Sequence, residues 1–176
     1  MLPFILVASL CVGAVSVYLP VSMRRMRDLG VAFALLAAGL AVYIALPGFQ
    51  SNSIFGPQSI WQLDGVSAML LVLIAFVSVT VTIMAHEYFG SEHADHIVFE
   101  TDLRHYYGMA PLLMALMYVA ALSNHLGLTW LALTACLLVT TLLVAFYRKQ
   151  SAIEAAWKYV VLCTLGLGLA LAGIIF

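Results

Sequence analysis

The chain has 176 residues, of which 65% are hydrophobic and only 9% are charged, and its mean hydropathy is +1.10. A water-soluble domain of this size needs a polar surface that this composition cannot supply, so we expect lipid to surround most of the chain. The net charge of −1 gives no basis for binding nucleic acid. The composition therefore predicts an all-α, polytopic membrane protein.

Six segments in chain order are long and apolar enough to cross a bilayer core of about 30 Å, which takes about 20 helical residues. They predict one membrane domain over residues 1–176, with helices at about 2–19, 29–46, 65–85, 106–122, 126–147 and 152–176. The first segment lacks a basic amino-terminal region and a small-x-small cleavage pattern. We therefore expect it to remain as a helix of the mature protein and not to be a signal peptide.

The basic residues outside these segments sort to alternate connections. If the six helices alternate in direction, the connections after the first, third and fifth lie on one side of the membrane. They hold Arg24, Arg25, Arg27, Arg104, Arg148 and Lys149, which leaves Lys158 as the only other basic residue. Under the positive-inside rule, this side is cytoplasmic and both termini are non-cytoplasmic.

The segment 86–105 is the one long polar stretch, and it holds four of the five histidines. His93 and His96 with Glu92 could face together on a helix, which leaves a metal site and a contact with a partner subunit open as alternatives. No second cluster at a recognised spacing supports a metal. A polar cytoplasmic connection is therefore the favoured interpretation, and we expect no metal.

Glu154 and Lys158 enter the sixth apolar segment together, four residues apart. This spacing puts them on one helix face, where they could pair. An ionisable pair in a membrane-length segment is a candidate functional site, because a lysine taken out of water exchanges its proton more readily than an arginine does. The structural alternative is that both side chains reach the cytoplasmic interface as an anchor, beside Trp157.

Three further polar residues lie at predicted helix boundaries. Asp64 precedes the third helix, where its carboxylate could accept backbone N–H bonds as an N-cap. Asn124 and His125 lie at the break before the fifth helix, where polar groups cost little. The cysteines (Cys11, Cys136 and Cys163) lie in apolar segments without a C-x-x-C spacing, so we expect no disulfide framework, metal site or redox cofactor.

Several short motifs carry a resemblance to a known family. The most specific is the hexapeptide EAAWKY, from Glu154 to Tyr159, followed by Cys163. The other matching positions are Asn124, Leu126, Trp130, 142–144 and Tyr147, with 63–67 and 106–108 upstream. On these residues the chain resembles the antiporter-like membrane subunits of hydrogenase-4 and formate hydrogenlyase, above all component F of hydrogenase-4. That group is related to subunits of NADH:quinone oxidoreductase and to Mrp antiporters.

The resemblance covers only the amino-terminal six-helix portion of that family, and it implies a shortened subunit with no redox chemistry of its own. Its partners would be sister membrane subunits and, through the complex, soluble redox subunits, in the cytoplasmic membrane of a prokaryote. Its role would be proton or sodium translocation, with Lys158 and Glu154 in the ion pathway, or assembly of the membrane arm. No cofactor is implied for this chain.

One departure from the family pattern limits that role. Family members place a glutamate on the fifth helix a few residues after the tryptophan, and counting from Trp130 this position holds Thr134. A threonine cannot carry the charge of that carboxylate. A degenerate, non-conducting scaffold therefore stays open as an alternative, as does, less favoured, a small stand-alone transporter.

Overall fold

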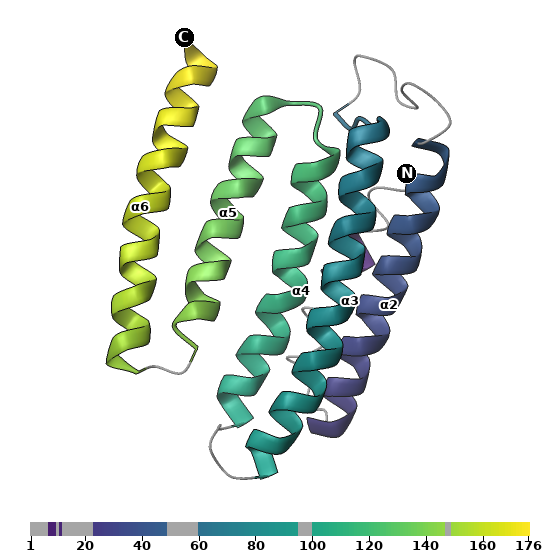
Figure 1. Cartoon of the computed structure of the whole chain (residues 1–176), viewed down its shortest axis with the longest axis vertical. Helices are drawn as coiled ribbons and strands as arrows, with labels where there is room; N and C mark the ends of the chain where they lie inside the picture. Colours follow the sequence, from purple (N-terminus) through teal and green to yellow (C-terminus); the bar gives the residue numbers. More distant parts are fainter. Residues whose placement is uncertain (1–6, 10, 12–22, 49–59, 95–99, 147–148) are drawn as a thin grey trace.

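The computed structural model describes residues 7–9, 11, 23–48, 60–94, 100–146 and 149–176 (Figure 1). Its helices are α2 (Met23–Gly48), α3 (Gly65–Ala94), α4 (Glu100–Leu122), α5 (Leu126–Val144) and α6 (Gln150–Ile175). In this part of the chain, five helices are long and apolar enough to cross a membrane, which confirms the predicted all-α membrane class. The predicted first helix, 2–19, lies almost wholly outside the described residues.

The helices extend into the polar segment 86–105. α3 continues to Ala94 and α4 begins at Glu100, although the apolar spans are Gly65–Phe89 and Leu103–Leu122. The reason is that backbone hydrogen bonding can continue when a helix leaves lipid, because glutamate, histidine and alanine are compatible with a helix. The change of composition therefore marks the edge of the apolar span and not the end of the helix.

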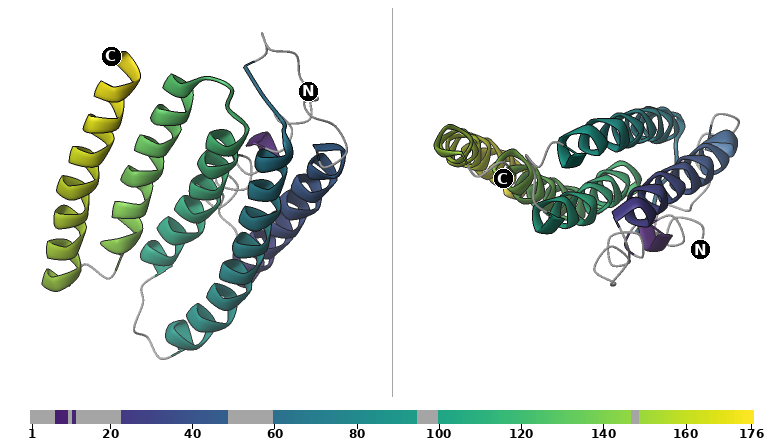
Figure 2. Two further views of the ribbon diagram at one scale, coloured as in Figure 1. Left: turned by 45° about the horizontal axis from the view of Figure 1, so that its top comes forward. Right: turned by 90° about the horizontal axis from the view of Figure 1, so that it is seen from below.

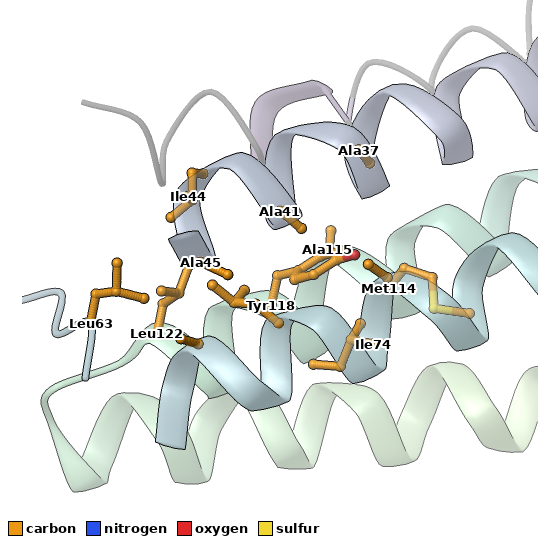
Figure 3. Packing of buried hydrophobic residues seen from close by; sticks show 13 residues of the cluster. Ala37, Ala41, Ile44, Ala45, Leu63, Ile74, Met114, Ala115, Tyr118 and Leu122 are labelled. Carbon is orange, nitrogen blue, oxygen red and sulfur yellow. The ribbon is translucent and has the colours of Figure 1, made fainter. Parts of the chain in front are cut away.

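α2, α3 and α4 pack together around one core (Figures 2 and 3). The buried face of α2 carries small residues at three- and four-residue spacing, which are Ala34, Ala37, Ala41, Ala45 and Gly48. Small residues let helix backbones approach closely, which is the main source of packing between helices in lipid. At Gly48 an added Cβ would lie only 2.9 Å from the Cβ of Ala68 on α3. This seam fixes the distance between α2 and α3.

Two loops meet beside this bundle, at the end of the molecule where α3 and α5 begin. Trp61 and Ser123 form an isolated antiparallel β-bridge. The N–H of Gln62 donates to the carbonyl of Leu122, and the N–H of Asn124 donates to the carbonyl of Ile60, both at 2.9 Å. The bridge ties the start of α3 to the end of α4.

α5 and α6 extend the bundle sideways. α5 packs on α4 and on α6, whereas among the described helices α6 packs on α5 alone and stands at the edge (Figure 1). The indole N–H of Trp130 on α5 donates to the carbonyl of Leu167 on α6 at 2.8 Å. The buried and half-buried residues of α6 form one narrow stripe along the helix. They are Ala152, Ala156, Val160, Cys163, Leu167 and Leu171. The rest of α6 faces outward.

Candidate functional site

Glu154 and Lys158 form an ion pair on α6. The ammonium nitrogen of Lys158 donates to a carboxylate oxygen of Glu154 at 2.5 Å. Both side chains are 57% exposed, so this chain leaves more than half of each uncovered. The helix alone positions the pair, since residues four apart lie one above the other on its surface.

The pair points away from the other described helices. Ala156 lies midway between the two residues and is buried on the side of α5. At 3.6 residues per turn, Glu154 and Lys158 each lie about 160° around the helix axis from Ala156, in opposite senses. Trp157 is also exposed. The charged groups therefore sit on the uncovered outer face of α6.

The depth of the pair follows from the start of α6 at Gln150. With a rise of 1.5 Å per residue, Glu154 lies about 6 Å and Lys158 about 12 Å into the helix. An unpaired charge at the second depth would be costly against hydrocarbon, and pairing reduces that cost. The arrangement can hold a proton on Lys158 next to a carboxylate, and it can offer both groups to a neighbouring protein surface.

Thr134 lies elsewhere in the molecule. Its hydroxyl donates to the carbonyl of Trp130 on its own helix at 2.8 Å. Two further threonines of α5 bond in the same way, Thr140 to Cys136 and Thr141 to Leu137. The pair on α6 faces away from α5, so the structure does not bring Thr134 to Glu154 and Lys158.

The predicted boundary residues lie at helix starts. The N–H of Ser67 donates to the Asp64 carboxylate at 2.8 Å, and this bond to the charged form holds the pKa of Asp64 below its ordinary value of 3.8. His125 precedes α5 in an extended conformation, but its side chain makes no capping bond. Its carbonyl instead accepts hydrogen bonds from the hydroxyls of Ser123 and Thr129. The Asn124 backbone belongs to the bridge described above.

Two polar features of the structure had no counterpart in the sequence analysis. His86 on α3 pairs with Asp28 on α2 at 3.3 Å, across 58 positions of sequence. Tyr118 on α4 buries its hydroxyl in the bundle core. Neither carries a sequence signal, because each depends on which helix faces pack together.

The metal alternative concerned Glu92, His93 and His96, whose side chains lie outside the described part. Among the residues that the structure does describe, no group of three or more His, Cys, Asp or Glu side chains could hold a metal ion. The polar groups that remain candidates for a functional site in the described part are the Glu154–Lys158 ion pair and the hydroxyls inside the bundle.

The fold and the ion pair define a multi-pass membrane protein with an uncovered charged group on its outermost helix. No family model matches the chain. Over 117 residues it is 32% identical to the "Hydrogenase-4 component F homolog" of Methylacidiphilum infernorum (isolate V4). The similarity covers 66% of this chain and confirms its resemblance to the hydrogenase-4 F type of antiporter-like subunit. The match covers 25% of the length of that relative.

Proposed function

We propose that the chain is an antiporter-like membrane subunit of a membrane-bound hydrogenase or a related oxidoreductase resembling NADH:quinone oxidoreductase. Its role there is to contribute to proton or sodium translocation, or to the assembly of the membrane arm. The observation that carries the proposal is the Glu154–Lys158 pair on the uncovered face of α6. The similarity to a hydrogenase-4 component F homolog supports the same class of complex.

The outer face of α6 packs against a sister membrane subunit in this proposal. This face is apolar over most of its length, with Leu162, Leu165 and Leu169 each more than 60% exposed. Lipid alone would solvate these leucines, but it would not solvate an ion pair whose carboxylate residue lies about 6 Å and whose lysine lies about 12 Å into the helix. A neighbouring subunit supplies polar partners at that depth, and soluble redox subunits bound to the complex supply the electron transfer.

The orientation in the membrane follows from charge. α2 begins, α3 ends, α4 begins, α5 ends and α6 begins at one end of the molecule (Figure 1). All the Lys and Arg residues except Lys158 belong to the helix ends and connections there. We place this end in the cytoplasm of a prokaryotic cell, with both termini on the opposite side.

In this proposal Lys158 exchanges protons and Glu154 stabilises its charged form. A proton entering from the cytoplasmic end would reach Lys158 about two turns into α6, where the ammonium pairs with the carboxylate of Glu154 one turn closer to that end. Thr134 cannot be that acceptor, because it faces its own backbone and carries no charge. In this proposal the neighbouring subunit provides the acceptor.

The second candidate is a non-conducting scaffold, and the chemistry of α5 favours it. The hydroxyl side chains of α5 are all threonines, and Thr134, Thr140 and Thr141 donate to carbonyls of their own helix. A scaffold needs only the packing surface of α6. A stand-alone transporter is less favoured, because one intramembrane ion pair offers little with which to coordinate a substrate.

The test is Lys158→Ala in the assembled complex, with proton pumping and electron transfer measured in the same vesicles. The proposal predicts that pumping falls while electron transfer continues. Lys149→Ala, which alters a cation at the start of the same helix, is the matched control and should leave pumping unchanged. Unchanged pumping by Lys158→Ala in an intact complex would exclude the proton-exchange role and leave the scaffold.

A further inference from the structure

The outer face of α6 changes in character along the helix. Near the start of α6 it carries the Glu154–Lys158 pair. Alternating steps of three and four residues continue the same face to the other end of the helix, through Val161, Leu165, Gly168 and Ala172, all of them exposed. We call these six residues the outer line. The ion pair and two small residues therefore share one side of α6, across the helix from the buried Ala156.

Gly168 packs against nothing in the described part of the chain. A Cβ added to it would meet no atom within 4 Å. The contrast is Gly48 of α2, where an added Cβ would lie 2.9 Å from the Cβ of Ala68 on the neighbouring helix. A glycine inside a helix is less favourable than an alanine, and close approach of a second helix is what compensates for it in lipid. At Gly168 the small residue is in place, and the second helix must come from outside the described part.

The ion pair selects the side of α6 on which that helix lies. Gly166 is equally open, but it lies about 160° around the helix from Gly168. The line of residues through Gly166 at the same spacing holds no charged residue, whereas the outer line holds both charges of α6. Lipid tails offer neither a donor to the Glu154 carboxylate nor an acceptor to the Lys158 ammonium, and a protein helix can offer both. Charge complementarity and room for close approach therefore favour the same side.

We propose that one transmembrane helix of the sister subunit lies along the outer line. The inference rests on the proposed function and adds the mode of docking to it. The partner helix approaches most closely at Gly168 and Ala172, where it presents a small side chain of its own, because only small residues let two backbones come so near. Level with Glu154 and Lys158 it carries one hydrogen-bond donor and one acceptor. The charged end of the line selects the partner helix, and the small end sets how tightly that helix packs.

The test compares two glycines of α6 in the complex purified from native membranes in mild detergent. Gly168→Leu fills the outer line and should lower the recovery of the sister membrane subunit with the tagged chain by about tenfold, through overpacking at a close contact. Gly166→Leu adds the same side chain on the other side of α6 and should leave recovery unchanged. Both positions are open and leucine is the better helix former, so unfolding of the isolated chain should show no loss of stability in either variant. Equal recovery with the two variants would overturn the docking mode.

A cross-link identifies the occupant while Gly168 stays intact. Leu165, in the middle of the outer line, is replaced by photoreactive p-benzoylphenylalanine, and mass spectrometry identifies what it captures in native membranes. We expect a peptide from a transmembrane segment of another subunit of the complex. A peptide of this same chain, or lipid alone, would overturn the proposal. Recovery of the sister subunit without this cross-link would overturn the docking mode alone, whereas a purified chain with no membrane partner would overturn the proposed function as well.

Discussion

The α2–α4 bundle and the α5–α6 edge differ in where their polar and charged side chains lie. In the bundle, small residues on α2 bring the helices together, and the side chains of Ser78 and Tyr118 are buried. At the edge, α6 touches one helix and turns its charged groups outward. The bundle buries a core of its own, whereas α6 leaves most of its surface uncovered by the described part of the chain, as the proposed contact with a partner subunit requires. Mutations in the bundle should therefore mainly lower stability, whereas mutations on the outer face of α6 should mainly impair function.

The largest effect on stability is expected from the buried seam of α2. Ala41→Leu adds bulk at a position with no exposed area, and overpacking of this kind should lower the free energy of unfolding by about 1–3 kcal/mol. Ala32→Leu places the same side chain on the exposed face of α2 and should have little effect. Unfolding in mixed micelles measures both. Equal losses would show that the seam is no tighter than the surface.

A smaller effect is expected at the start of α3. Asp64→Ala removes the carboxylate that accepts the Ser67 N–H and should cost about 1 kcal/mol at neutral pH. The folded pKa of Asp64 lies below 3.8, so its contribution is complete above that pH and is lost as the pH falls through the folded value. Asp64→Asn keeps a neutral cap and should show no such loss. A wild-type advantage over Asp64→Ala that does not decline as the pH falls below 3.8 would contradict this account.

Removing the hydrogen bond between α5 and α6 should lower stability by a smaller amount still. Trp130→Phe deletes the bond to the Leu167 carbonyl, and such interhelical bonds are worth about 0.6 kcal/mol on average in membranes. Hydrogen exchange should therefore rise in α6 before it rises in α2–α4. Trp157→Phe alters an exposed tryptophan of α6 and serves as the control. If exchange rises equally throughout the chain, the edge is not a separate unit.

The smallest effect on stability is expected from the ion pair itself. Replacing Glu154 and Lys158 together by leucine should change the unfolding free energy of the isolated chain by no more than about 0.5 kcal/mol, because exposed pairs at this spacing contribute little. Denaturant titration in detergent measures the change. A loss of several kcal/mol would mean that the pair stabilises this chain and is not kept for a partner.

The sequence predicts the five described helices well because a run of about 20 apolar residues in lipid can satisfy its backbone only as a helix. It predicts the helix ends less well, since the polar residues of 86–105 continue the helices beyond the apolar spans. It indicates that Glu154 and Lys158 can pair, because their spacing is local. It does not show that they face outward, nor that Tyr118 is buried in the bundle core, because both depend on which faces of the helices pack.

The central claim is that α6 is an interface with a sister subunit, and purification in mild detergent tests it most directly. A tagged chain extracted from its native membranes should migrate as part of a large complex that contains another multi-pass membrane subunit and soluble redox proteins. Charge reversal by Lys158→Glu on the outer face of α6 should weaken that association, while Lys149→Glu should leave it intact. Recovery of a stable, folded monomer with no membrane partner would contradict the account.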